Sequence, residues 1–217
     1  GAPRRRVVVS CADGDRDLEP RNRGPLAEAA GCDVVQDAID ADVLIVGPRL
    51  QAKTSVAIAR AKRLPVLTGD WLRARAARRL ADESDARWLA RDASFEARYG
   101  VDLSAPRPRG PGVLAGYAVV VTPSLPDQHR YRQAAEAAGA LLVRALDACP
   151  RDRRAMVVAS HSKPDEGGPL RLEPRDLILC LIRDELPEDR LAARHLAWKE
   201  SAARRRRASA GFDLGTG

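Results

Sequence analysis

The 217-residue chain is poor in aromatic residues and contains no long apolar run. Phe, Trp and Tyr together make up 4% of the sequence, so any core must be built mainly from Val, Leu, Ile and Ala. No stretch of about eighteen apolar residues is available to cross a bilayer, and the N-terminus lacks the apolar segment and cleavage site of a signal peptide. We therefore expect a soluble, intracellular protein with no membrane partner.

Signatures of catalysis and of metal binding are missing as well. The four cysteines form no C-x-x-C pair and no Cys/His spacing suited to zinc, so we expect free thiols at Cys11, Cys32, Cys149 and Cys180. We find no glycine-rich phosphate loop, nucleophile elbow, paired-carboxylate motif or metal motif. The sequence therefore predicts that the protein is not an enzyme and uses no cofactor.

Basic residues are in excess, with a formal net charge of +7 and a pI near 9.7. Much of this excess lies in two runs, Arg4-Arg5-Arg6 and Arg204-Arg205-Arg206-Arg207. Terminal runs of this kind are more often solvated tails than binding sites. The charge permits attraction to nucleic acid, acidic peptides or phosphate, and it does not choose among them.

The most informative pattern of the chain occurs twice. Three segments recur in one order at nearly one spacing: Val7–Ser10, Ala27–Gly31 and Asp70–Leu72 in the first copy, and Val119–Thr122, Ala135–Gly139 and Asp176–Ile178 in the second. Matching segments at matching intervals indicate a duplicated module, each copy about 100 residues long.

The first copy alternates short apolar runs with segments of helical periodicity. The runs predict strands over residues 6–10, 32–36, 43–46 and 65–67. Helices are expected from Pro25 to Gly31, from Thr54 to Lys62, and after a cap at Asp70. Because helical crossovers join most of the strands, we expect an α/β fold in which each module is a small, mainly parallel four-stranded sheet flanked by helices.

The second copy repeats this order with one element missing. Residues 160–169 are polar and rich in turn formers, so we expect a loop to replace the second helix. The prolines of residues 85–111 indicate a linker, partly helical over residues 87–96. The predicted domains are therefore residues 1–84 and 112–187, separated by that linker and followed by a C-terminal helix and basic tail over residues 188–217.

Three segments carry a resemblance to a known family. Residues Lys53–Leu72 are similar to the Trp-bearing signature of BRCT repeats, and Gly116–Pro123 is similar to the start of such a repeat. Residues Asp92–Leu103 resemble the inter-repeat segment of tandem BRCT pairs that read phosphopeptides. The resemblance covers nearly the whole chain up to Leu186, so the chain is identified as a tandem BRCT pair of the phosphopeptide-binding type.

The resemblance implies a phosphate site on the first repeat. In the family, a hydroxyl after the first strand, the next backbone N–H and a lysine near the start of the second helix hold the phosphate. Ser10 matches the hydroxyl position and Cys11 the N–H position. The family lysine falls on Ser55, which can add a hydroxyl, while Lys53 at the same helix start is the candidate cation.

The resemblance also implies a groove between the repeats for a side chain three residues beyond the phosphoresidue. The family arginine that grips the peptide main chain falls here on Ala52, and Thr122 of the second copy matches Ser10 without an opposing lysine. The second repeat is therefore expected to supply packing and groove wall.

Three functions remain open from the sequence. The first is binding of a phosphorylated protein or peptide by a monomeric module of a nuclear chromosomal, DNA-damage-response or kinetochore protein. The second is DNA binding through the basic tail or the phosphate pocket. The third is a protein scaffold that binds without phosphate.

Overall fold

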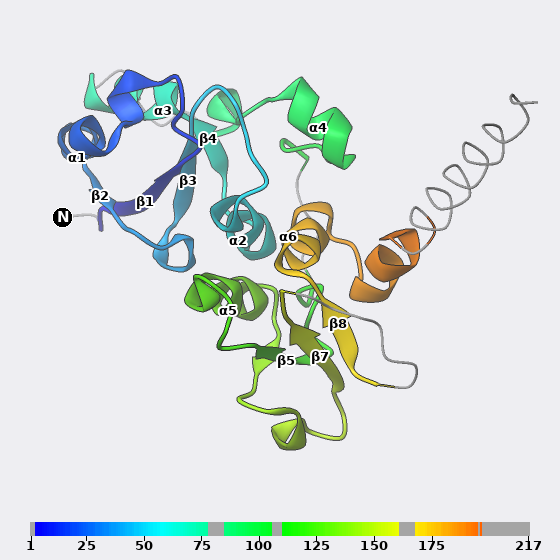
Figure 1. Cartoon of the computed structure of the whole chain (residues 1–217). Coiled ribbons are helices and arrows are strands. Elements are labelled where there is room, and N and C mark those ends of the chain that lie inside the picture. The colour runs from blue at the N-terminus through cyan, green and yellow to red at the C-terminus, as the bar shows by residue number, and fades with distance from the viewer. Residues whose placement is uncertain (1–2, 78–84, 106–109, 161–167, 195, 197–217) are drawn as a thin grey trace, which may run out of the picture.

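A computed structural model describes residues 3–77, 85–105, 110–160, 168–194 and 196 of the chain. They form two α/β modules, each built on a four-stranded, fully parallel sheet, that meet through helices (Figure 1). The predicted α/β fold with two four-stranded sheets is confirmed. None of the described helices is long and apolar enough to span a membrane.

The first sheet has the strand order β2-β1-β3-β4, with β1 at Arg5–Ser10, β2 at Cys32–Val34, β3 at Val43–Val46 and β4 at Val66–Thr68. Alternate side chains of a strand point to opposite faces. Val7 is therefore buried against the helices α1 (Pro20–Ala29) and α3 (Gly69–Ala76), and Val8 against α2 (Thr54–Lys62). Both faces of this sheet are covered, as expected for parallel strands.

Two helix starts of the first module differ from the sequence prediction, while α2 has the predicted bounds. Helix α1 begins at Pro20, not at Pro25, which lies exposed inside the helix. Pro20 occupies the first turn, where a missing N–H costs no hydrogen bond. Helix α3 begins at Gly69 after Thr68, so Asp70 lies in the first turn and is not the cap.

The second sheet has the order β6-β5-β7-β8, with β5 at Tyr117–Val121, β6 at Leu141–Leu142, β7 at Arg154–Val158 and β8 at Leu170–Leu172. Its helices are α5 (Gln128–Ala137) and α6 (Pro174–Arg183). The prediction that Asp176 starts the last helix is wrong, because Pro174 provides the first turn. The loop predicted between β7 and β8 falls mostly on residues 161–167, outside the described residues.

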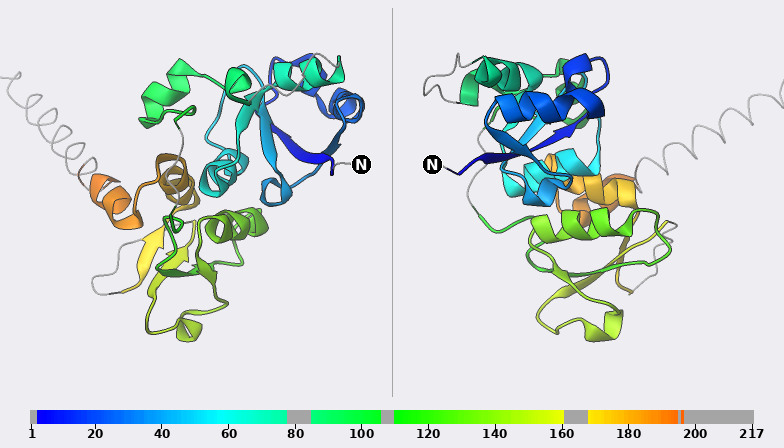
Figure 2. Two further views of the ribbon diagram at one scale, coloured as in Figure 1. Left: turned by 180° about the vertical axis from the view of Figure 1, so that it is seen from behind. Right: turned by 90° about the vertical axis from the view of Figure 1, so that its left-hand side faces the viewer.

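The two modules share one core. Helix α2 of the first module contacts both α5 and α6 of the second, and the three helices lie together between the sheets in every view (Figure 2). Val56 and Ile58 of α2 belong to the same buried cluster as Ala134 of α5 and Leu181 of α6. Buried Arg60 of α2 donates to the carbonyl oxygen of Ile182 at 3.3 Å.

The segment between the modules is ordered by specific contacts. It contains a 3-10 helix, η3 (Asp85–Trp88), and the helix α4 (Ala93–Tyr99). The Asp92 carboxylate accepts from the N–H of Phe95 at 3.0 Å, which caps α4, and from the N–H of Leu50 at 2.9 Å. These hydrogen bonds lower the pKa of the Asp92 carboxyl group, and the one from Leu50 has the largest effect.

After α6, residues 187–194 are helical, which agrees with the start of the predicted C-terminal helix. This C-terminal helix packs on the second module, where the Tyr117 hydroxyl donates to Glu188. Burial, followed by this hydrogen bond, raises the pKa of Tyr117. The rest of the predicted helix and the Arg204–Arg207 run lie outside the described residues.

Candidate functional site

The four residues predicted to bind phosphate come from two segments that the fold brings together. Ser10 is the last residue of β1 and Cys11 follows it, while Lys53 precedes α2 and Ser55 lies in its first turn. In parallel α/β sheets, the carboxyl ends of the strands lie beside the amino ends of the helices that pack on them. All four residues line one cavity of about 700 Å³, which we call the β1–α2 cavity.

The two predicted hydroxyl groups are in direct contact. Ser10 Oγ lies 2.6 Å from Ser55 Oγ, and both side chains are half-buried. One hydroxyl donates to the other, and the one that accepts keeps its own hydrogen for a further acceptor. The contact also fixes the rotamers of both side chains beside the cavity.

Backbone donors surround this serine pair. Cys11 has a left-handed backbone with φ of 52°, and its N–H has no acceptor among the described residues. The N–H groups of Thr54, Ser55 and Val56 occupy the first turn of α2, where helix geometry provides no intrahelical acceptor. The positive end of the helix dipole adds to their attraction for an anion.

A glycine that the sequence analysis did not single out sets this backbone geometry. Gly47 follows β3, and its N–H donates to the carbonyl oxygen of Cys11 at 3.2 Å. A Cβ atom at Gly47 would lie 2.6 Å from that oxygen, closer than van der Waals contact allows. The close approach of the two chains therefore requires glycine at this position.

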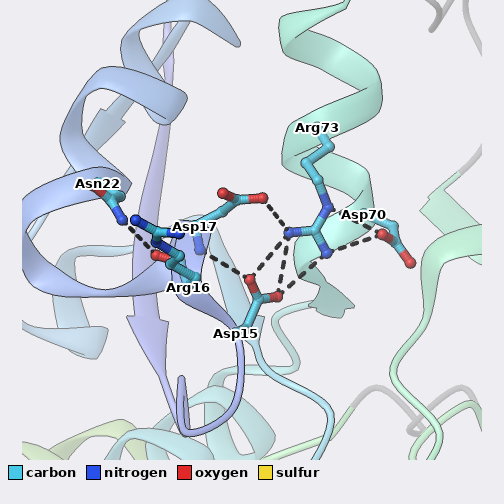
Figure 3. Close-up of polar contacts among 6 residues, drawn as sticks. All are labelled: Asp15, Arg16, Asp17, Asn22, Asp70 and Arg73. Carbon is cyan, nitrogen blue, oxygen red and sulfur yellow. Dashed lines mark hydrogen bonds and ion pairs between the residues drawn. The ribbon is translucent and has the colours of Figure 1, made fainter.

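An ion-pair network holds the loop that follows Cys11. The guanidinium of Arg73 on α3 lies between the carboxylates of Asp15, Asp17 and Asp70, as Figure 3 shows. Asp15 and Asp17 belong to the loop, so the network ties it to α3. The hydrogen bond with Asp15 raises the pKa of Arg73, which stays charged. The network thus positions one wall of the cavity.

The β1–α2 cavity carries charges of both signs. Besides Lys53, the cations are Arg23 of α1 and Arg130 of α5, and none of the three forms an ion pair in the described part of the chain. The acidic residues are Asp13, which accepts from Gln51 at 3.1 Å, and Asp37 and Asp127. An anion in this cavity is thus attracted by local donors and cations, not by a large net charge.

A second cavity of about 620 Å³, which we call the inter-module groove, continues the first. The two cavities share four lining residues: Ala52, Asp127, Tyr131 and Ile178. The groove is lined further by Tyr99 of α4 and by residues at the start of α6. The surface thus runs from Ser10 on the first module to α6 on the second.

The comparisons with known proteins address the fold. No protein-family model matches the sequence, and no curated protein matches it. Among solved structures, the chain is similar to the BRCT5-BRCT6 domains of S. pombe Brc1, with a TM-score of 0.59 and 14% identity over 85% of this chain and 94% of that one. The chain has the fold of a tandem BRCT pair. A structure of Rtt107p with phosphorylated histone H2A is also similar, with a TM-score of 0.49 and 10% identity over 84% and 88% of the two chains.

The two repeats of this fold differ at the position of the serine pair. Thr122 of the second repeat donates its hydroxyl to the carbonyl oxygen of Val158 at 3.2 Å, so this hydroxyl is already engaged within its own sheet. Trp71 of the first repeat is 1% exposed, and Leu177 of the second repeat is fully buried at the matching place. The Thr122 hydroxyl of the second repeat is thus bonded to the neighbouring strand, whereas the Ser10 hydroxyl of the first repeat contacts a helix.

The tandem BRCT fold adds residues to the site that sequence reasoning missed. Arg23 and Arg130 line the cavity through tertiary packing, and Gly47 contacts the Cys11 backbone beside it; no local sequence pattern marks any of these residues. Within the described residues, no group of three or more His, Cys, Asp or Glu side chains is placed to hold a metal ion. The site's chemistry therefore rests on hydroxyl, N–H and cationic groups.

Proposed function

We propose that this tandem BRCT module binds phosphoserine or phosphothreonine peptides through the β1–α2 cavity. The observation that carries the proposal is the contact of Ser10 with Ser55 at the amino end of α2, beside the Cys11 N–H, which has no acceptor in the part of the chain that the structure describes. A phosphate dianion is stabilised by short charge-assisted hydrogen bonds and by the positive end of a helix dipole. The arrangement provides both.

Each residue has a distinct role in the proposed complex. The Ser10 and Ser55 hydroxyls and the Cys11 N–H donate to phosphate oxygens. Lys53 lies directly before α2, is exposed, and has no ion-pair partner among the described residues, so it can supply the positive charge. Lys53 replaces the family lysine from two residues earlier in the chain.

The inter-module groove takes the peptide beyond the phosphoresidue. Tyr131 and Ile178 lie where the groove meets the β1–α2 cavity, so the peptide passes over side chains of the second repeat. The side chain of Ala52 at this junction has no group that could hydrogen-bond the peptide main chain. Anchoring therefore depends on the groove walls more than in pairs that have an arginine there.

We further propose, from the family resemblance, that the module acts as a monomeric, non-enzymatic reader of phosphopeptides. The protein that contains it would be a nuclear chromosomal, DNA-damage-response or kinetochore protein. Its domains are residues 1–84 and 112–187, joined by residues 85–111 and followed by residues 188–217.

Calorimetric titration with phosphoserine and phosphothreonine peptide libraries, each paired with its unphosphorylated counterpart, tests the function. We expect binding that requires the phosphate and falls at least about tenfold in the S10A/K53A double variant, because each lost charge-assisted bond is worth about 1.5–3 kcal/mol. The control is Thr122→Ala, the matching hydroxyl of the second repeat, which leaves the affinity unchanged.

Two other results would each replace the proposal. Equal affinity for phosphorylated and unphosphorylated peptides would indicate a phosphate-independent scaffold. Binding to DNA that falls steeply with salt and is lost on removal of residues 203–217 would indicate the DNA alternative.

A further inference from the structure

The amino end of α6, which forms the far wall of the inter-module groove, carries two opposite charges. Glu173 and Arg175 both line the groove, and Asp127, which directly precedes α5, is the other acidic residue there. Arg175 is exposed and has no ion-pair partner among the described residues. The sign of the charge that a peptide meets at this wall thus depends on whether the Glu173 carboxylate is paired with a cation.

The C-terminal helix supplies the partner of Glu173. Arg194 Nη1 lies 3.3 Å from the Glu173 carboxylate and 2.6 Å from that of Asp176. Asp176 is 4% exposed and is also paired with Arg190 at 3.1 Å. Among the described residues, Arg190 forms no ion pair with Glu173, so Arg194 is the arginine of this helix that pairs with the groove wall.

We propose that Arg194 is a positioning residue that neutralises Glu173, so that the groove selects peptides with acidic rather than basic residues after the phosphoresidue. With Glu173 paired, Arg175 is the uncompensated charge of the α6 wall. An acidic peptide side chain is then attracted, and a basic one is repelled. This inference rests on the proposed peptide-binding function, and it assigns part of the specificity to a helix outside both repeats.

The paired Asp176 fixes this arrangement. A buried carboxylate is costly unless it is paired, so Asp176 holds Arg190 and Arg194 against the start of α6. Arg194 is thereby kept within reach of Glu173, which is itself partly exposed in the groove wall. The buried contacts of Asp176 thus hold Arg194 in place for its pair with Glu173, which would otherwise be an exposed and weak ion pair.

The test uses two labelled phosphoserine peptides that are identical except for Glu or Lys at the second and third positions after the phosphoserine. Fluorescence anisotropy gives the ratio of their dissociation constants for each variant. We expect the wild-type chain to prefer the Glu peptide and Arg194→Gln to reduce the preference about two- to fivefold, the range for partly exposed ion pairs. In a Glu173→Gln background, Arg194→Gln should leave the ratio unchanged.

The matched control is Arg190→Gln. It removes the other partner of Asp176 and so reproduces any loss of stability, measured by thermal unfolding, but it should leave the peptide preference as in wild type. An equal change of preference in both arginine variants, or no change in either, would overturn the inference while phosphate-dependent binding still supports the proposed function. Failure of both peptides to bind would overturn the function and this inference together.

Discussion

The replacement of Arg60 by Met tests whether the two repeats form one cooperative unit. Arg60 belongs to the first repeat and is 9% exposed, and it donates to Ile182 O of α6 at 3.3 Å and to Asp102 O of the linker at 3.1 Å. It therefore joins three parts of the chain through one side chain. Met keeps an apolar stem of similar length and removes all of the guanidinium donors.

The expected cost follows from these two contacts. A hydrogen bond from a charged group contributes about 1.5–3 kcal/mol, and the full value is lost only where water cannot replace the donor. The carbonyl oxygen of Ile182 lies at the buried end of α6, whereas the carbonyl oxygen of Asp102 belongs to an exposed residue, where water can replace the donor. We therefore expect R60M to lower the free energy of unfolding by about 2–4 kcal/mol.

Urea unfolding, followed by circular dichroism and by tryptophan fluorescence, measures this loss. Because the two repeats share one core, we expect the wild-type chain to unfold in a single transition, and R60M should move this transition to lower urea and broaden it as the repeats uncouple. The matched control is R63M, because exposed Arg63 also donates to a carbonyl oxygen, that of Gly110 at 2.6 Å. A loss for R60M that is no larger than for R63M would refute this account of the interface.

Two further predictions concern the binding site and the linker. Gly47→Ala places a Cβ 2.6 Å from the carbonyl oxygen of Cys11, so it should displace Cys11 and reduce phosphopeptide affinity by more than about tenfold. The control is Gly24→Ala, which has open space around it and should leave the affinity unchanged. The pKa of Asp92 is lowered in the folded chain, mainly by the Leu50 N–H, so its contribution to stability is complete above the unfolded pKa of about 4 and is lost as pH falls through the folded pKa. Denaturation at several pH values should show that Asp92→Asn flattens this acid dependence, and an unchanged pH profile would contradict the assignment.

The sequence was sufficient for the elements that have strong periodicity. Thr54–Lys62 was predicted at its observed bounds because apolar residues recur at helical spacing between a polar start and a basic end. The start of α1 was wrong, since two prolines are compatible with a first turn and only packing decides between them. Boundaries set by tertiary contacts are not encoded in the local pattern.

The arrangement of the candidate site followed from the sequence only in part. The family resemblance assigns Ser10 and Ser55 to one phosphate site, and the structure brings their Oγ atoms within 2.6 Å. Arg130 lies on the other repeat, and its presence in the cavity depends on how α5 packs against α2. Gly47 is one of 16 glycines, and only the approach of Cys11 distinguishes it.

The position of α2 has a consequence for how such a chain can change. The helix is encoded in the first repeat, but its buried side chains contact both repeats. A substitution in α5 or α6 must therefore fit a partner encoded in the other repeat, and neither repeat can be exchanged for a foreign copy without new matching residues. The two halves can therefore change only together, because the β1–α2 cavity and the inter-module groove are lined by residues of both.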